Sequence, residues 1–581
     1  MENINLKING VDVSAPAGST ILEAARIANI DIPTLCFLKD INEIGACRVC
    51  VVEVKGARSL VASCVYPVNE GMEVFTNSPK VLESRKKTVQ LLLSAHDRKC
   101  LSCVRSGNCE LQKLARDLNV EDEGYFDGEK IAHTIDDSAA HMYRDNSKCI
   151  LCRRCVAMCD KVQGIGVIGA NQRGFKTEIC SAFEMGLGDT SCVSCGQCIA
   201  VCPTGAISEK DNTTEVFKAL ADTSKHVIVQ TAPAVRAALG EEFGFEIGTN
   251  VEGKMVTALR KLGFAKVFDT NFAADLTIME EAHEFLDRVK NGGKLPLITS
   301  CSPGWIKYCE HYFPDMTENL SSCKSPQQMF GAIAKTYYAE KMGIDPKDIV
   351  MVSVMPCTAK KFEIGRDDQN AAGVPDVDIA ITTRELARMI NRAGIKFASL
   401  EDGKFDDPLG ESTGAAVIFG ATGGVMEAAL RTAVATLTNA DPASVEFTDV
   451  RGVEGIKEAS YDVAGMTVKV AVASGLSNAR ELLTKVKNGE ADYHFIEIMG
   501  CPGGCVNGGG QPQQPASVRN FTDLRAERAK ALYSQDAASE VRMSHKNESV
   551  KKLYAEFLGE PGSHKAHEIL HTTYVKRKIN K

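Results

Sequence analysis

The 581-residue chain lacks the features that mark membrane, secreted and nucleic-acid-binding proteins. No uninterrupted apolar stretch reaches the roughly 18 residues that a membrane span needs. The first residues, MENINLKING, contain neither the basic nor the apolar region of a signal peptide, so we expect a cytoplasmic protein. Lys and Arg number 67 against 75 Asp and Glu, giving a net charge of −8 and no basic tract for nucleic acid. No G-x-G-x-x-G opens a helix after a strand, so we expect no nicotinamide or flavin site on this chain.

Cysteine, by contrast, is abundant and unevenly distributed. Of the 22 cysteines, 16 lie between Cys36 and Cys202, and only six lie in the 379 residues that follow. A cytoplasmic chain keeps its thiols reduced, so dense and regularly spaced cysteines indicate metal ligands rather than disulfides. The length and the 44% of hydrophobic residues allow several cores, and roughly three to five domains are expected.

The pattern of turns, helical stretches and apolar runs predicts a multidomain protein with α+β and α/β parts. We expect a β-rich domain at 1–80, a short helical domain at 81–120, a polar linker at about 120–145, a cysteine-rich module at 140–210 and an α/β domain at 215–581. In the last region, apolar runs alternate with helical patterns, as is typical of largely parallel, buried strands.

Three of these apolar runs end directly in a cysteine, namely Cys301, Cys357 and Cys501. Ligands of open α/β sheets bind beyond the carboxyl ends of the strands. We therefore expect several strand-end loops to hold one cofactor.

The module at 140–210 contains one cysteine run twice. The second run, Cys192-x2-Cys195-x2-Cys198-x3-Cys202-Pro203, has the spacing of a bacterial ferredoxin, and Cys149-x2-Cys152-x2-Cys155-x3-Cys159 repeats it with Asp160 in place of proline. In two-cluster ferredoxins the fourth cysteine of each run ligates the other cluster. One predicted [4Fe–4S] cluster is thus held by Cys149, Cys152, Cys155 and Cys202, and the other by Cys192, Cys195, Cys198 and Cys159. A pair of zinc sites is the alternative.

The β-rich domain carries Cys36-x10-Cys47-x2-Cys50-x13-Cys64. This run departs from the plant ferredoxin interval before the close cysteine pair but keeps the pair itself. It predicts a [2Fe–2S] site, with structural zinc as the alternative.

The remaining group is His96-x3-Cys100-x2-Cys103-x5-Cys109. Three cysteines leave one corner of a [4Fe–4S] cubane open, and His96 is placed to fill it. Fifteen cysteines and His96 make 16 ligands for four clusters, and only Cys180 of the first 16 cysteines is left over.

Three later segments resemble the signature segments of [FeFe]-hydrogenases. They are TSCSPGW (299–305), MPCTAKKFE (355–363) and EIMGCPGGCVNGGGQP (497–512). The order of the Fe–S modules before an α/β catalytic domain, which ends in a small-subunit-like tail, is also similar to that family. FAADLTIMEE and KSPQQMFGAIAKTYY most resemble catalytic subunits of heteromeric NAD(P)-linked hydrogenases, including electron-bifurcating ones.

The resemblance implies an H-cluster, in which a [4Fe–4S] cubane shares a cysteine sulfur with a diiron unit carrying CO, cyanide and a dithiolate. Matched positions make Cys357, Cys501 and Cys505 cubane ligands, with Cys505 as the bridge. Lys360 matches the lysine that pairs with a cyanide. The positions that match residues around the diiron unit are Pro233, Ala234, Ser325, Gln327, Met355 and Met499.

The family's proton path implies a route through Cys301, Glu281, Ser321, Glu284 and Arg288. The spacing of Glu281, Glu284 and Arg288 places them on one face of a helix. By spacing alone, a solvated charged face would be the favoured interpretation. The motif context favours the proton path.

Two positions depart from the family pattern. Ala234 stands where serine is frequent. Ser302 stands where relatives usually have the second of two adjacent cysteines, a cubane ligand. We expect Ser302 to bind iron through oxygen, although Cys301 or solvent could fill that corner instead. Alkoxide is a harder donor than thiolate, so this corner should bind iron more weakly.

The resemblance also implies partners. A flavin and NAD(P) subunit, a small [2Fe–2S] subunit and maturation proteins that insert the diiron unit are expected, with ferredoxin as a further candidate partner. Neither nucleic acid nor a membrane is expected. A self-contained ferredoxin-linked hydrogenase is one alternative. An H2 sensor or electron relay with an H-cluster impaired at Ser302 is another.

Overall fold

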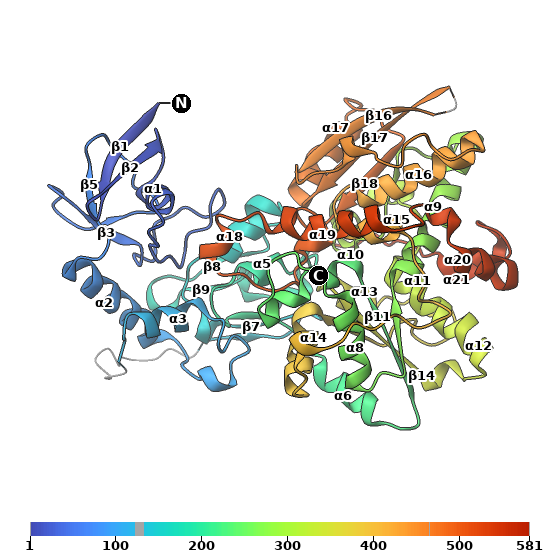
Figure 1. Cartoon of the computed structure of the whole chain (residues 1–581), viewed down its shortest axis with the longest axis horizontal. Coiled ribbons are helices and arrows are strands. Elements are labelled where there is room, and N and C mark those ends of the chain that lie inside the picture. Colours follow the sequence, from blue (N-terminus) through green and yellow to red (C-terminus); the bar gives the residue numbers. More distant parts are fainter. Residues whose placement is uncertain (1, 122–132, 464, 580–581) are drawn as a thin grey trace.

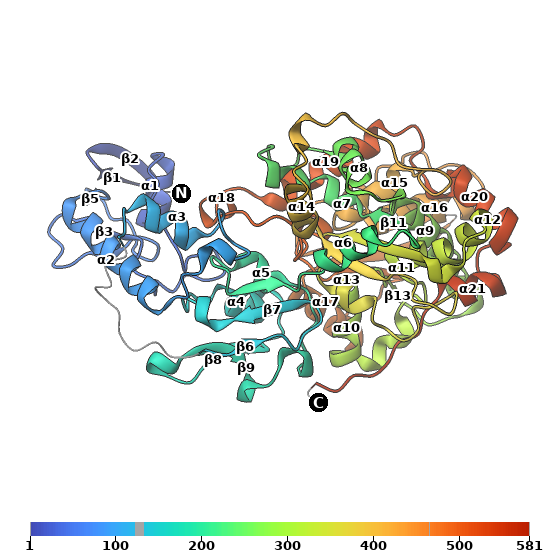
Figure 2. The ribbon, with the colours of Figure 1, turned by 90° about the horizontal axis from the view of Figure 1, so that it is seen from below.

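The computed structural model describes residues 2–121, 133–463 and 465–579. The cysteine-rich modules lie at one end of the molecule and the α/β region at the other (Figure 1). Helix α18 (Ala516–Arg519), late in the sequence, lies back against the modules (Figures 1 and 2). A segment close to the C-terminus therefore packs against the N-terminal modules.

The first domain begins with the predicted hairpin of β1 (Asn3–Ile8) and β2 (Val11–Pro16). Asn9 and Gly10 turn the chain at positive φ, as a two-residue hairpin loop requires. Helix α1 (Ile21–Ile27) starts with a capping box between Thr20 and Glu23. The sheet has the order β2-β1-β5-β3-β4, completed by β3 (Val51–Val54), β4 (Val61–Ala62) and β5 (Glu73–Phe75).

Helices α2 (Pro79–Ala95) and α3 (Glu110–Asp117) flank the next cysteine loop. The predicted linker at 120–145 is wrong in its last third. Strands β6 (Ile135–Asp136) and β7 (Met142–Asp145) form a sheet with β10 (Ile207–Glu209), because β7 pairs antiparallel with both. The central part of that predicted linker lies outside the described residues.

The two cysteine runs form a compact module around short helices. These are α4 (Arg154–Ala157) and α5 (Gln197–Val201), and the hairpin between the runs consists of β8 (Ile168–Asn171) and β9 (Glu178–Ser181). The module's edge is thus a strand pair that the cysteine spacing does not reveal.

The predicted parallel strands form two sheets of four strands each. One sheet, in the order β12-β11-β14-β15, is all parallel and comprises β11 (His226–Thr231), β12 (Lys266–Asp269), β14 (Ile349–Met355) and β15 (Ile379–Thr382). The other, in the order β13-β18-β17-β16, comprises β13 (Leu297–Ile298), β16 (Ile456–Val463), β17 (Met466–Ser474) and β18 (Phe495–Met499). In this sheet only β16 runs antiparallel to its neighbour.

Helices cover these sheets and supply the core between them. They are α6 (Thr213–Ala221), α7 (Pro233–Arg236), α8 (Glu252–Leu262), α9 (Asn271–Asn291), α10 (Pro303–Tyr312), α11 (Pro326–Ile333), α12 (Ala339–Met342), α13 (Ala359–Glu363), α14 (Thr383–Arg392), α15 (Gly414–Val417), α16 (Gly424–Thr438), α17 (Leu476–Lys487), α19 (Leu524–Ala538), α20 (Glu548–Leu553) and α21 (His564–Leu570).

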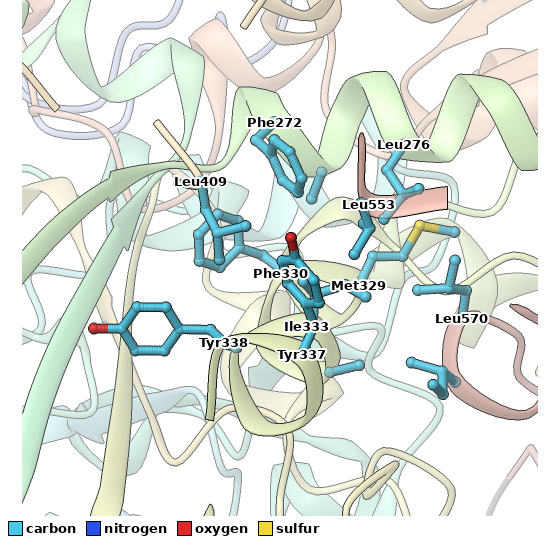
Figure 3. Close-up of a cluster of buried hydrophobic side chains, with 14 of the residues drawn as sticks. Phe272, Leu276, Met329, Phe330, Ile333, Tyr337, Tyr338, Leu409, Leu553 and Leu570 are labelled. Atoms are coloured by element: carbon cyan, nitrogen blue, oxygen red, sulfur yellow. The ribbon is translucent and has the colours of Figure 1, made fainter. Parts of the chain in front are cut away.

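One core cluster joins α9 and α11 to the end of the chain. Phe272 of α9 and Phe330 of α11 pack with Leu553 of α20 and Leu570 of α21 (Figure 3). Burial of such side chains stabilises the fold by about 1.5–3 kcal/mol each. The C-terminal helices are therefore an integral part of the core of the α/β region. Among the described residues, no helix is both long and apolar enough to cross a bilayer.

Candidate active site

The ends of three parallel strands meet at one internal cavity. Cys301 follows β13, Cys357 follows β14 and Cys501 follows β18, and all three line this cavity. The wall also includes the predicted residues Pro233, Ser302, Gln327, Met355, Lys360, Met499 and Cys505. Side chains distributed over half of the sequence are thus brought to one place, because the carboxyl edges of both sheets face it.

Two predicted residues, Ser325 and Ala234, are not part of this wall. Ser325 lies just behind it, with Oγ 2.7 Å from Nζ of Lys360. Ala234 is fully buried, and its backbone oxygen accepts a hydrogen bond from Gln511. A β-carbon at Gly420 would lie 3.2 Å from the Ala234 side chain, so a side chain at position 420 would press against Ala234.

The glycine-rich loop after β18 packs too closely for side chains. A β-carbon at Gly508 would lie 2.1 Å from the backbone oxygen of Pro356, and one at Gly509 would lie 2.3 Å from that of Cys195. Both contacts are far shorter than van der Waals distance. The glycines therefore allow this loop to lie against the turn before Cys357 and against the second cysteine run of the ferredoxin-type module.

Lys360 is the cation of the cavity. Its Nζ donates to Ser325 Oγ, to Glu363 Oε2 at 2.9 Å and to the backbone oxygen of Cys301 at 3.2 Å. Glu363 also accepts hydrogen bonds from Ser325 and Gln327. A buried charge is tolerated when it is paired and hydrogen-bonded, and these contacts fix the ammonium group at the cavity wall.

The thiols in the cavity share an apolar environment. Burial, followed by the neighbouring Cys357, raises the pKa of Cys505 to about 12. Burial, followed by Cys357 and Cys505, raises the pKa of Cys501 above its ordinary range. Negative charge on these three sulfurs therefore needs a compensating cation, as iron would provide.

Ser302 lies at the same edge and precedes α10. Its Oγ accepts a hydrogen bond from the backbone N–H of Gly500 at 3.1 Å. This oxygen thus shares the loop that carries Cys501, which is where a fourth cubane ligand would belong. The adjacent Cys301 also faces the cavity, so the two side chains of the Cys301–Ser302 pair reach the same space.

Hydrogen bonds join the outer part of the predicted proton path. Glu284 of α9 accepts hydrogen bonds from Ser321 Oγ at 3.0 Å and from Arg288 at 2.6 Å. Glu281, one turn earlier on α9, is 1% exposed. Burial raises the pKa of Glu281 to about 8, and the nearby Ser321 side chain opposes this shift. Burial and the nearby Glu281 raise the pKa of Cys301 well above its usual range, so its thiol is protonated.

Sequence reasoning missed the residues that hold this path in place. The backbone N–H of Ser322 donates to Glu284 at 3.0 Å, and Ser322 Oγ lies 2.8 Å from Nδ1 of His571. Tyr574 donates its hydroxyl to the backbone oxygen of Ser321. These contacts join the loop after β13 and α10 to the C-terminal tail, and no short-range spacing could have indicated them.

The thiols of the two cysteine runs in the ferredoxin-type module lie near one another. Burial and the nearby thiols of Cys152, Cys149 and Cys202 raise the pKa of Cys155. Burial and those of Cys192 and Cys159 raise the pKa of Cys198. Each run therefore lies close to the last cysteine of the other run, as in the predicted ligand sets.

The four cysteines of the first domain also lie together. Sγ of Cys50 is 3.3 Å from Sγ of Cys64, and Sγ of Cys36 accepts the backbone N–H of Cys47 at 3.5 Å. A hydrogen bond with Cys50 and burial raise the pKa of Cys64, and the nearby Cys36 and Cys47 raise it further, so the two pairs lie near each other.

His96 ends α2 and is 9% exposed, and its Nδ1 is buried without a hydrogen-bond partner in the described part of the chain. Cys100 and Cys103 belong to one turn, whose backbone hydrogen bond is 3.1 Å long. Sγ of Cys109 contacts the backbone oxygen of Pro203 at 3.7 Å. Within the described parts of the chain, no three His, Cys, Asp or Glu side chains converge closely enough for one metal ion. In a four-iron cluster each thiolate binds a different iron, so its ligands are spaced more widely.

The cysteine groups follow one another through direct contacts. A β-carbon at Gly205 would lie 2.5 Å from Sγ of Cys103, so the loop of Cys103 lies against the ferredoxin-type module. Asn42 of the first domain donates to the backbone oxygen of Cys152 at 3.0 Å. Thr358, beside Cys357, donates to the backbone oxygen of Ser194 at 2.8 Å. A series of cysteine sites thus leads to the cavity.

Family models match nearly the whole chain. Their descriptions are "2Fe-2S iron-sulfur cluster binding domain" (residues 1–79), "NADH-ubiquinone oxidoreductase-G iron-sulfur binding region" (85–123), "4Fe-4S dicluster domain" (139–206), "Iron only hydrogenase large subunit, C-terminal domain" (225–509) and "Iron hydrogenase small subunit" (522–577).

Known proteins are similar over comparable lengths. The chain is 52% identical to the NADP-reducing hydrogenase subunit HndD of Solidesulfovibrio fructosivorans over 99% of this chain and 100% of that protein. It is 46% identical to iron hydrogenase 1 of Clostridium pasteurianum, covering 98% and 99% of the two chains. The structure of apo [FeFe]-hydrogenase HydA1 from Chlamydomonas reinhardtii matches with a TM-score of 0.57 and 43% identity, over 64% of this chain and 100% of that one.

Proposed function

The chain belongs to the iron-only, or [FeFe]-, hydrogenase family, and we propose that it is the catalytic subunit of a heteromeric enzyme that couples H2 to NAD(P). The 2Fe-2S and 4Fe-4S modules before the catalytic domain make it an electron-transferring member of that family. The observation that carries the proposal is the end-to-end similarity to an NADP-reducing hydrogenase subunit.

We assign the cavity at the strand ends to the H-cluster, because the residues present fit it. Soft thiols of Cys357, Cys501 and Cys505 reach one apolar space, as the cubane and its bridge to the diiron unit require. Ser302 offers an oxygen at the fourth corner, which departs from the family pattern. Lys360 supplies a fixed positive charge for an anionic iron ligand. When bound, the H-cluster supplies the metal centre at which electrons, protons and H2 are interconverted.

The chain's own contribution to the reaction is a controlled proton supply. A proton enters near Arg288 and Glu284, passes Ser321 to Glu281 and reaches the Cys301 thiol at the cavity wall. The pKa of about 8 lets Glu281 hold and release a proton near neutral pH. The apolar wall of Pro233, Met355 and Met499 excludes water, so protons follow the hydrogen-bonded route.

Electrons reach the cavity through four accessory clusters in our proposal. Cys36, Cys47, Cys50 and Cys64 would hold the [2Fe–2S] cluster, and His96 would complete a [4Fe–4S] site with Cys100, Cys103 and Cys109. The two interleaved sets of the ferredoxin-type module would hold the remaining pair. The contact between Thr358 and Ser194 supports this order, because it joins the run that begins at Cys192 to the loop of Cys357.

The decisive experiment is anaerobic purification of the native protein from its own cells, which also supply the maturation proteins and any partner subunits. We expect a flavin-containing NAD(P) subunit and a small [2Fe–2S] subunit to co-purify, with infrared bands from CO and cyanide. H2-dependent reduction of NADP or NAD should require those subunits. A monomer that shows the infrared bands and reduces only ferredoxin would contradict the heteromeric assignment.

A self-contained hydrogenase is the second candidate. It is favoured by the 46% identity over almost the full length of a protein named iron hydrogenase 1. The same accessory modules serve both candidates, so the co-purification result separates them. An H2 sensor or electron relay is a third candidate, for which turnover would be absent although the infrared bands are present.

A further inference from the structure

A buried histidine lies beside a predicted cluster cysteine without belonging to any predicted ligand set. His141 immediately precedes β7 and is 1% exposed. Its Nε2 lies 4.0 Å from Sγ of Cys192, the first cysteine of the second run. Its Nδ1 is buried and has no hydrogen-bond partner within the described chain. Contact with the sulfur is thus the one polar contact that these ring nitrogens make among the described residues.

The chemistry of the two atoms fixes the direction of this contact. His141 is 1% exposed and its ring contacts no carboxylate among the described residues, so the neutral ring, which carries one N–H, is the form that fits this site. A cysteine sulfur bound to iron can accept a hydrogen bond but cannot donate one. The tautomer with its proton on Nε2 therefore fits. The other tautomer would turn a lone pair toward the sulfur and leave a buried N–H without an acceptor, a more costly arrangement.

We propose that His141 donates an N–H···S hydrogen bond to Cys192 and thereby raises the reduction potential of the accessory cluster nearest the catalytic cavity. This inference rests on the proposed function, because it requires a cluster on Cys159, Cys192, Cys195 and Cys198. Reduction adds negative charge to the cluster, so a donor to its sulfur stabilises the reduced state more than the oxidised state. His141 thus acts on the potential of the cluster through Cys192 and does not bind iron itself.

The neighbouring ligand set lacks an equivalent side-chain donor in its described contacts. Sγ of Cys149 accepts the backbone N–H of Leu151 at 3.4 Å. Sγ of Cys202 lies 3.8 Å from the hydroxyl of Thr204, but this hydroxyl donates to the backbone oxygen of Lys148 at 2.8 Å. The histidine therefore makes the two clusters of one module unequal. Electrons moving toward the cavity would pass to the cluster with the higher potential.

The test is an EPR-monitored redox titration of the complete, anaerobically purified protein. His141→Leu removes the donor, and we expect one [4Fe–4S] cluster to become harder to reduce by about threefold to tenfold in its equilibrium constant, or about 30–60 mV for one electron. His141→Gln keeps an N–H donor and should remain close to the native potential. His133→Leu is the matched control, because His133 of the same module pairs with Glu178 at 2.8 Å and contacts no cysteine among the described residues.

A His141→Leu protein with full iron content and unchanged potentials would overturn the proposal. If that variant loses the cluster, pulsed EPR of protein labelled with 15N-histidine decides instead. A weak 15N coupling to a reduced cluster is expected in His96→Ala, where the proposed histidine ligand is gone. It should disappear in the double variant with His141→Gln. Absence of the weak coupling in His96→Ala would refute the hydrogen bond. A native protein without any [4Fe–4S] clusters would refute the proposed function itself.

Discussion

The Fe–S modules and the catalytic region use cysteine in opposite ways. In the modules, the proposed ligands of one run are separated by thirteen residues or fewer, and each set of the ferredoxin-type module takes one ligand from the other run. In the catalytic region, Cys357 and Cys501 come from different sheets and are far apart in the sequence. The first kind of site is encoded by local spacing, and the second exists only after two sheets have packed. Replacing one residue of a module should therefore affect only the nearest cluster. Replacing one residue of the cavity should have an effect that depends on the chemical role of its side chain.

Removing the thiol at the end of the proton path should have the largest effect. Cys301→Ala leaves no group between Glu281 and the cavity that can carry a proton, so turnover should fall by about 10²- to 10⁴-fold. Gas chromatography of H2 produced with a reduced dye measures this loss. Iron content and the CO and cyanide bands should persist. Loss of cubane iron in this variant would show that Cys301, rather than Ser302, is a cubane ligand.

An equivalent change in a module should leave the catalytic cavity intact. His96→Ala should damage or remove only its own cluster, because His96 lies at the end of α2 in a separate loop. We expect the rate of electron exchange with the external partner to fall by roughly tenfold, because a lost cluster lengthens one electron-transfer step. A tenfold change corresponds to about 1.4 kcal/mol. The rate of partner reduction measures the electron exchange, and infrared spectra of the CO and cyanide ligands measure whether the cavity is intact. If these bands vanish, the modules and the cavity are not independent.

The pH dependence should distinguish the two regions in the native protein. Glu281 has a raised pKa of about 8, so its carboxyl group is protonated below this pH and ionised above it. H2 production should be retained at neutral pH and fall by roughly fourfold between pH 7 and 8.5, as the protonated fraction declines. Dye reduction of the accessory clusters needs no such proton and serves as the control. A flat production profile up to pH 9 would contradict this role of Glu281.

The sequence predicted most of the fold and much of the site, and the gaps have physical causes. The hairpin of β1 and β2, the parallel strands and the meeting of Cys301, Cys357 and Cys501 follow from local patterns and from strand order. The sheet of β6, β7 and β10 was not predicted, because its short strands in polar sequence gain their partners only through pairing.

The C-terminal tail shows a second limit of sequence reasoning. His571 and Tyr574 hold the loop of Ser321 and Ser322 by hydrogen bonds across a large sequence distance. His141 likewise meets Cys192 only in the folded module. Periodicity and spacing describe contacts within one element or one loop, so contacts of this kind remain invisible to them.

The smallest effect, and the sharpest test of the comparison, concerns Ser302. Its oxygen lies beside the backbone N–H of Gly500 at 3.1 Å, in the loop that leads to Cys501. If this oxygen ligates the cubane, Ser302→Cys restores a softer donor at the same position and should bind iron more firmly. We therefore expect slower iron loss to a chelator and a few-fold increase in turnover. The proton path at Cys301 is unchanged in this variant.

The matched control is Ser302→Ala, which removes the donor and keeps the backbone. The order of iron retention should be cysteine, then serine, then alanine, followed by iron analysis and by EPR of the cubane. If all three proteins retain iron equally, position 302 is not a ligand. The cavity would then hold its cubane through Cys357, Cys501 and Cys505 with solvent or Cys301 at the fourth corner. The sequence pattern of the Cys301–Ser302 pair would then have predicted the wrong ligand, because only the packing of the two sheets determines which side chain reaches the iron.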